Sequence, residues 1–392
     1  MTTASKSARD FIAPHLRDIP KSGIRDFFDI VAGRKDVISL GIGEPDFQTP
    51  WHIREKAIAS IERGATRYTS NLGTPELRQA IAGYMRRSFQ AEYDWKTEML
   101  VTVGVSEAFD IALRAVLSPG DEVLYHEPCF VAYAPLIRMA HGVPVAVDTF
   151  RKDDFRLTVA ELEKKVTPRT RVLLLNFPNN PTGATLDKAD TEALADFALR
   201  HDLLVISDEV YSELTYEGGR HSMASIPRIR ERLIFLNGFS KAWSMTGFRL
   251  GFICAPAPLT DAMMKIHQYC MMCASSTGQI AGLEALEHGE ADIAEMRESY
   301  HQRRNFVVAS LNEMGLDCFM PRGAFYVFPS IQSTGLTARE FSLRLLNERS
   351  VACVPGSAFG ACGAGFLRCA YATGMDQLKE AMDRISDFIR KL

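Results

Sequence analysis

The stretch NGFSKAWSMTGFRLGF, residues 237–252, ends one apolar run and begins another, and both runs read as strands. Lys241 stands there among small residues, and Arg249 follows eight positions later. Lysine is the side chain that can hold an aldehyde as a reversible imine, and burial or nearby positive charge must lower its pKa for this at neutral pH. We predict that Arg249 lies on the following strand, where it supplies that charge and binds a phosphate. The stretch therefore predicts a Schiff-base lysine.

A second apolar run, LLVISDEVY at residues 203–211, ends in a carboxylate. It delivers Asp208, with Tyr211 three residues later. Open α/β sheets bind ligands at the carboxyl ends of their strands. A carboxylate that leaves a dry strand needs a cationic partner, and the protonated ring nitrogen of a cofactor would serve. Asp208 is our candidate for that partner, and a helix cap or a salt bridge is the structural alternative.

A third run, VLLLNFPNNPTG at residues 172–183, reads as a strand followed by a loop whose prolines and glycine fix the backbone path. Asparagine amides can donate to an oxygen. We expect Asn180 to donate to a phenolic oxygen on the same cofactor ring, with Tyr211 reaching that oxygen from the next strand. Ordinary turn chemistry is the alternative for this loop.

Residues 99–116 read as a strand, the turn GVSEA and an amphipathic helix. The unpaired N–H groups at a helix start bind anions. Val105, Ser106 and Glu107 would therefore donate to a phosphate, with the Glu107 carboxylate pointing away from it. Many strand–helix units begin in this way, so the turn carries weight only in combination with the other segments.

Strand and helix patterns alternate from about residue 98 to residue 255. This alternation predicts an α/β fold with a mainly parallel, seven-stranded sheet covered by helices on both faces. A long helix at 297–314, two strands in GAFYVF and FLRCAYA, and a final helix at 376–392 predict a smaller α+β domain. The predicted divisions are an N-terminal arm that joins the small domain (1–44), a large domain (45–285) and a small C-terminal domain (286–392).

Together these segments resemble the fold type I pyridoxal phosphate enzymes of the class I/II aminotransferase family, over nearly the whole chain. The N-terminal part up to GEPDF is most similar to the bacterial and archaeal branch that includes aspartate, aromatic and N-acetyl-diaminopimelate aminotransferases. The matching pieces occur in family order: GEPDF (43–47), Tyr68 in RYTSNLG, GVSEA, Phe130 in EPCFVAY, NNPTG, DEVY, SKAWSMTGFRLG, GAFYVF (323–328) and Arg368 in FLRCAYA.

The resemblance implies a pyridoxal 5′-phosphate cofactor and a role for each matching residue. Lys241 would hold the cofactor as an imine and later move the substrate proton, and Asp208 would keep the cofactor ring nitrogen protonated. Phe130 would stack on the ring. Arg368 would bind the substrate α-carboxylate with its guanidinium fork, and the backbone of Gly43 would meet the same carboxylate.

The resemblance also implies a homodimer with shared active sites, because Tyr68 would reach the phosphate in the neighbouring subunit. One position departs from the family pattern. Residue 238 is glycine, where relatives often have a serine that contacts the phosphate. We expect Ser240 and Ser106 to compensate.

Bulk properties exclude other classes of partner. The chain has 392 residues and a net charge of −3, without long blocks of like charge, so nucleic acid and anionic membranes are not expected partners. The N-terminus MTTASKSARD lacks the apolar core of a signal peptide, and we expect a cytoplasmic protein. Cys270 and Cys273 form a C-x-x-C without a second pair, so no metal site is predicted.

The resemblance implies that the substrates are amino acids and 2-oxo acids. It leaves the preferred donor open among aspartate, glutamate and aromatic amino acids, with 2-oxoglutarate as an expected acceptor in a ping-pong reaction. Arg114 is a candidate for binding a distal carboxylate, and Ile24 and Ile42 are candidates for an apolar pocket. Two alternatives remain at this point: a pyridoxal phosphate-dependent C–S β-lyase, and a non-catalytic sensor that binds the cofactor.

Overall fold

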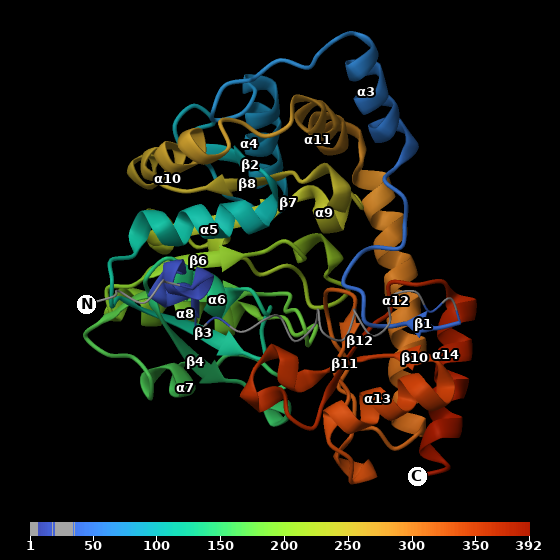
Figure 1. The fold of residues 1–392 in the computed structure, drawn as a ribbon. Helices are drawn as coiled ribbons and strands as arrows, with labels where there is room; N and C mark the ends of the chain where they lie inside the picture. The colour runs from blue at the N-terminus through green and yellow to red at the C-terminus, as the bar shows by residue number, and fades with distance from the viewer. Residues whose placement is uncertain (1–6, 18, 20–33, 35) are drawn as a thin grey trace.

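A seven-stranded sheet forms the centre of the computed structural model, which describes residues 7–17, 19, 34 and 36–392 (Figure 1). The strand order is β2-β8-β7-β6-β5-β3-β4. Strand β8 pairs antiparallel with β2 and β7, and the other neighbours are parallel. The strands are β2 (Met99–Thr102), β3 (Glu122–Glu127), β4 (Val143–Asp148), β5 (Thr170–Asn176), β6 (Leu204–Asp208), β7 (Leu233–Gly238) and β8 (Gly251–Cys254). The predicted sheet and its seven strands are confirmed.

Alternate residues of the central strands enter two different hydrophobic cores. In β5, Leu173 and Leu175 enter one core and Val172 and Leu174 the other, as the period of two in a strand requires. The first core also takes α3 (Trp51–Glu62), α4 (Pro75–Phe89), α7 (Val159–Glu163), α8 (Lys188–Arg200) and α11 (Ser276–His288). The second takes α5 (Gly104–Val116), α6 (Tyr133–Met139) and α10 (Ala257–Cys270). Helices therefore cover both faces of the sheet.

The remaining C-terminal elements gather around a third core on one side of the molecule (Figure 1). They are the helices α12 (Glu290–Glu313), α13 (Ala338–Arg349) and α14 (Met375–Ile389) and the antiparallel sheet β11-β12-β9 (Val354–Pro355, Leu367–Ala370 and Tyr326–Val327). Strand β1 (Ile38–Ser39) pairs in parallel with β10 (Val351–Ala352). The segment just before residue 45 therefore hydrogen-bonds to the C-terminal part of the chain.

Helix α12 begins at Glu290, seven residues before the predicted start at position 297. Its first turn carries Glu290 and Asp292, and acidic side chains stabilise a helix N-terminus by interacting with the helix dipole. The prediction of its start was wrong because it relied on apolar periodicity, which this long and mostly polar helix lacks.

Short elements complete the described chain, and some of them lie next to the cavity described below. The helices are α1 (Pro14–Arg17) and α9 (Phe239–Ala242), and the 3-10 helices cover Ala8–Phe11, Arg151–Asp153, Ser212–Leu214, Met223–Ser225, Pro227–Arg232, Thr246–Phe248, Gln332–Thr334, Gly356–Phe359 and Ala361–Gly363. Among the described residues, no helix combines the length and apolar character needed to cross a membrane.

Candidate active site

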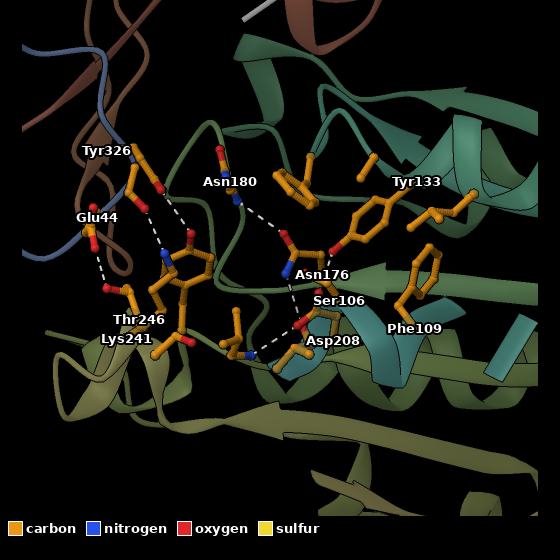
Figure 2. A pocket seen from close by; sticks show the side chains of 18 of the residues that line it. Glu44, Ser106, Phe109, Tyr133, Asn176, Asn180, Asp208, Lys241, Thr246 and Tyr326 are labelled. Carbon is orange, nitrogen blue, oxygen red and sulfur yellow. Dashed lines mark hydrogen bonds between the residues drawn. The ribbon is translucent and has the colours of Figure 1, made fainter. Parts of the chain in front are cut away.

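A cavity of about 470 Å³ lies where the carboxyl ends of β5 and β6 meet the small sheet. Figure 2 shows Lys241 and Tyr326 toward one end of it, and Asp208 and Tyr133 toward the other. The structure brings eleven of the thirteen predicted site residues to its lining: Gly43, Val105, Ser106, Phe130, Asn180, Asp208, Tyr211, Ser240, Lys241, Arg249 and Arg368.

Lys241 reaches the cavity from α9, the short helix that follows β7. Its Nζ donates to the carbonyl oxygen of Gly43 at 2.7 Å. Burial lowers the pKa of Lys241 to about 8; Glu44 opposes the shift, and Arg368 and Arg249 add to it. The amine is therefore close to its neutral, nucleophilic form near physiological pH.

Arg249 does not lie on a strand, so this prediction was wrong. It follows the 3-10 helix Thr246–Phe248 in the left-handed conformation, with φ 49°, and β8 begins two residues later. The turn places its guanidinium against the start of α5. A Cβ atom at Gly104, whose φ is +75°, would lie 2.7 Å from Arg249 Nη2, so glycine makes this approach possible.

Arg249 and the start of α5 form an anion-binding corner of the cavity. Ser106 lies in the first turn of α5, where backbone N–H groups are unpaired, and Ser240 lies on α9. Close packing explains the glycine at position 238. A Cβ atom there would lie 2.8 Å from Val105 Cγ2 and 3.0 Å from the Leu250 carbonyl oxygen. A serine at 238 would therefore push the corner apart.

Asp208 is the last residue of β6 and is buried. Its carboxylate accepts from the Tyr133 hydroxyl at 2.7 Å and from the Val210 N–H at 3.3 Å. Burial raises the pKa of Asp208 to about 6, against these two hydrogen bonds and the charge of Lys241. Asp208 forms neither a helix cap nor a salt bridge with the described residues, and it lines the cavity, where its carboxylate could pair with a cation.

Tyr211 and Asn180 line the cavity and contact residues of the small sheet. The hydroxyl groups of Tyr211 and Tyr326 are 2.9 Å apart. The side-chain oxygen of Asn180 accepts from Arg368 Nη1 at 3.0 Å, which orients the amide nitrogen away from that bond.

Arg368 is a buried cation on β12 that has no carboxylate partner within the described part of the chain. Besides Asn180, it donates to the carbonyl oxygen of Gly41 at 2.5 Å, and its Nε has no acceptor. The rings of Tyr326 and Phe359 each have their centroid 4.7 Å from its Cζ. Burial lowers its pKa, and an uncompensated buried charge is costly, so the site fits an anionic ligand.

The comparisons with known proteins agree with this geometry. The family described as aminotransferase class I and II matches residues 35–385. The chain belongs to this family. It is 49% identical to an aspartate aminotransferase of Pyrococcus abyssi, over 94% of this chain and 96% of the relative. It is 45% identical to an aromatic-amino-acid aminotransferase of Thermococcus litoralis, over 97% and 98% of the two chains.

A solved structure of an aromatic aminotransferase from Pyrococcus horikoshii superimposes on this aminotransferase with a TM-score of 0.89, at 48% identity, covering 94% of this chain and 99% of the other. The aminotransferase transfers an amino group between an amino acid and a 2-oxo acid with pyridoxal 5′-phosphate. The cavity offers matching chemistry for each part of this cofactor: an amine for its aldehyde, a buried carboxylate for its ring nitrogen and an anion-binding corner for its phosphate.

Two predicted site residues do not line the cavity with their side chains. The Glu107 carboxylate turns to the opposite side of α5, where it accepts from the Val103 N–H at 2.5 Å and lies 2.6 Å from His267 Nδ1. Tyr68 is 80% exposed in the loop before α4.

The residues considered for substrate side chains also lie elsewhere. Arg114 is on the last turn of α5 and pairs with Asp110 at 3.4 Å, outside the cavity, so within one chain it does not bind a distal carboxylate. Ile42 is 48% exposed and is not part of the lining. Ile24 lies outside the described residues.

Sequence reasoning missed several aminotransferase residues that contact the predicted ones. Tyr133 donates to Asp208, Asn176 donates from its side chain to the Asp208 carbonyl oxygen at 2.9 Å, and Tyr326 contacts Tyr211. The Thr246 hydroxyl also donates to Glu44 across the lysine end of the cavity. Tyr326 stood within the recognised motif GAFYVF, and Tyr133 stood three residues after Phe130, but neither position carried a chemical signal of its own.

Proposed function

We propose that the cavity holds pyridoxal 5′-phosphate through the residues of its lining. Arg249, Ser106 and Ser240, with the unpaired N–H groups at the start of α5, bind the phosphate. Asp208 pairs with the protonated ring nitrogen, and Phe130 covers one face of the ring. The burial of Asp208 next to a single strong donor, Tyr133, supports this assignment, since a cationic ring would compensate its charge.

Asn180 and Tyr211 donate to the phenolic oxygen of the ring. The Asn180 amide nitrogen points away from Arg368, because the amide oxygen accepts the arginine bond. Both side chains come from turns at the carboxyl ends of neighbouring strands, β5 and β6.

When bound, the cofactor accepts the electron pair that the substrate Cα–H bond leaves behind. Lys241 removes that proton and returns it at the cofactor side, which is possible because its pKa is lowered to about 8. Arg368 fixes the substrate carboxylate with two parallel hydrogen bonds, and so sets the direction of the Cα–H bond. Gly43 lies next to Arg368 without a side chain, and a Cβ there would lie 2.6 Å from the Tyr326 hydroxyl oxygen.

The observation that carries this proposal is that the buried Arg368, in the same cavity as Lys241 and Asp208, has no carboxylate partner among the residues that the structure describes. We propose that its partner is the α-carboxylate of an L-amino acid, with aspartate, glutamate or an aromatic amino acid as donor and a 2-oxo acid such as 2-oxoglutarate as acceptor, in a ping-pong reaction. The names of the relatives support these donors. Arg249 and Arg368 are the arginines in the cavity lining, so the described part of one chain offers no further arginine for a distal carboxylate.

The test is a single half-reaction. The purified enzyme is mixed, without any acceptor, with aspartate, glutamate, phenylalanine, alanine or cysteine, and its absorbance spectrum and products are followed. We expect a lasting spectral change and about one equivalent of 2-oxo acid per site for each true donor. Continuous release of ammonia without spectral conversion would contradict transamination and favour the C–S β-lyase.

We also propose a homodimer in which Tyr68 reaches the phosphate in the partner subunit. Tyr68 is 80% exposed and Tyr269 is 87% exposed. Asn71 donates to the Met272 carbonyl oxygen at 2.7 Å, so the two exposed segments lie together. An exposed apolar surface of this kind supports a contact with a second copy.

The domain divisions at 44/45 and 285/286 and the cytoplasmic location stay predictions. Limited proteolysis would test the divisions, since cleavage is expected in exposed turns between domains. Fractionation of cells that express the full chain would test the location.

A further inference from the structure

The hydroxyl group and the ring of Tyr326 contact two different parts of the cavity. Tyr326 is fully buried and begins β9, opposite Ala370 on β12. Its hydroxyl oxygen lies 2.9 Å from that of Tyr211, and its ring lies against the guanidinium of Arg368, with Cζ 4.7 Å from the centroid. One side chain therefore touches a residue assigned to the cofactor and a residue assigned to the substrate.

The space for the hydroxyl depends on Gly43. A Cβ atom at Gly43 would lie 2.6 Å from the Tyr326 hydroxyl oxygen, closer than any two such atoms pack. The Gly43 carbonyl oxygen also accepts from Lys241 Nζ. The Tyr326 hydroxyl thus lies beside the backbone that holds the lysine (Figure 2).

Two phenols that share one hydrogen bond must divide the roles of donor and acceptor. Burial raises the pKa of Tyr211 well above its ordinary value, and Tyr326 raises it further. Burial also raises the pKa of Tyr326, but the charge of Arg368 and the bond with Tyr211 lower it. The distance alone allows either hydroxyl to be the donor. A phenol has one proton, and in the proposed function Tyr211 gives its proton to the phenolic oxygen of the cofactor, so Tyr211 accepts from Tyr326.

We propose that Tyr326 is a positioning residue: its hydroxyl donates to Tyr211, which directs the Tyr211 proton to the phenolic oxygen of the bound cofactor, and its ring holds Arg368 in place for the substrate carboxylate. This inference rests on the proposed function. Hydrogen bonds in such a chain polarise and strengthen one another, so the Tyr326 hydroxyl acts on the cofactor through Tyr211.

The first test replaces Tyr326 by phenylalanine, which keeps the ring and removes the hydroxyl. The visible absorbance of the holoenzyme is titrated against pH, without substrate. We expect its midpoint to rise by roughly half to one pH unit, the equivalent of a neutral hydrogen bond. The midpoint rises because weaker donation from Tyr211 leaves more electron density on the phenolic oxygen. This oxygen then binds more tightly the proton of the imine between Lys241 and the cofactor.

The second test replaces Tyr326 by leucine, which also removes the ring. Binding of succinate and 3-phenylpropanoate, carboxylates that cannot react, is measured by calorimetry on the holoenzyme. Loss of the buried cation–π contact should weaken binding roughly 3- to 30-fold for Tyr326→Leu, while Tyr326→Phe stays within about twofold of the wild type.

Tyr371→Phe is the matched control. Tyr371 is also buried in the small domain, and its hydroxyl donates to the Ala324 carbonyl oxygen at 3.0 Å, away from the cavity lining. We expect this variant to lose thermal stability as Tyr326→Phe does, without any change in the absorbance titration. Equal titration shifts in both variants would mean a general effect of lost stability and would overturn the inference.

The inference and the proposed function fail in different ways. A wild-type protein that neither binds the cofactor nor transaminates would contradict the proposed function. An active wild type whose titration midpoint is unchanged by Tyr326→Phe would contradict the role of Tyr326 alone.

Discussion

Burial shifts the pKa values of two residues in the cavity in opposite directions. It lowers the pKa of Lys241 to about 8 and raises that of Asp208 to about 6, because in each case it disfavours the charged form. At neutral pH the lysine thus carries less charge than usual, while Asp208 remains ionised at a cost in free energy. A bound cationic ring would remove that cost. The cost should therefore be measurable as reduced stability of the protein without cofactor.

Asp208→Asn should therefore stabilise the cofactor-free protein above pH 6. Between about pH 4 and pH 6 the folded wild type binds more protons than the unfolded chain, so its free energy of unfolding falls as pH rises through this range. The variant has no carboxyl group at position 208 and should not show this fall. Its free energy of unfolding at neutral pH should therefore be higher than that of the wild type by on the order of 2–3 kcal/mol. Denaturant unfolding at a series of pH values measures it. Parallel pH profiles for the two proteins would contradict the shifted carboxyl group.

Arg368→Lys should weaken every substrate alike, because lysine keeps the charge but loses the two-pronged geometry. Loss of charge-assisted hydrogen bonds predicts a fall in kcat/KM of roughly 10- to 100-fold for all donors. Arg114→Ala is the control, since Arg114 pairs with Asp110 outside the cavity. A selective loss of acidic donors in Arg114→Ala would show that this arginine binds a distal carboxylate after all.

At the scale of elements, glycines decide how closely α5 and the turn after α9 approach each other. Gly104 admits Arg249, and Gly251 is similarly tight, since a Cβ there would lie 2.8 Å from the Val105 nitrogen. The anion-binding corner therefore depends on the close packing of α5, the turn that carries Arg249 and the start of β8, which glycines make possible. Its geometry should be sensitive to a single added methyl group.

Gly104→Ala tests this sensitivity, with Gly64→Ala as its control. Both glycines have φ near +70°, but a Cβ at Gly64 meets nothing within 4 Å. Each substitution costs about 1 kcal/mol for the left-handed backbone. Gly104→Ala should in addition displace Arg249 and weaken cofactor binding roughly 10-fold or more, measured by equilibrium titration of the cofactor-free protein. Equal cofactor affinities in the two variants would contradict the assigned corner.

The elements themselves were predictable where burial leaves a clear pattern. The seven strands of the large sheet are short apolar runs, and most of them are buried on both faces, with β4 as the more exposed exception. Asp208 and Lys241 were found because polar residues at the ends of such runs stand out. The left-handed turn at Arg249 carried no signal, because residues other than glycine rarely adopt it. Tyr133 and Tyr326 were missed because their partners lie 75 and 115 positions away in sequence.

At the scale of the whole molecule, the cavity takes residues from both ends of the chain. Gly43 comes from the N-terminal segment, Arg368 from the small sheet, and Lys241 from α9, the helix that follows β7 of the large sheet. Arg368 and Gly43 were predicted through the family resemblance, since no local pattern links positions so far apart. The exposure of Tyr68 is consistent with the proposal that this residue completes the cavity of a second chain.

Mixing two inactive variants tests this contribution. In a mixed dimer of Lys241→Ala and Tyr68→Ala chains, one site has both its lysine and the partner's intact tyrosine. Random exchange of subunits should therefore restore about a quarter of the wild-type activity, measured by steady-state transamination. Mixing Lys241→Ala with Asp208→Asn should restore none, because both changes damage a chain's own site. Equal recovery in the two mixtures, or none in the first, would contradict a shared site.

The most direct measurement of the central claim is to find which residue holds the cofactor. The yellow holoenzyme is treated with borohydride, which fixes the bond between lysine and cofactor permanently, and its peptides are analysed by mass spectrometry. We predict one pyridoxyl phosphate group on the peptide that contains Lys241, and no such label in Lys241→Ala, which still binds the cofactor without a covalent bond. A label on any other lysine, or a Lys241→Ala variant that still transaminates, would contradict the account.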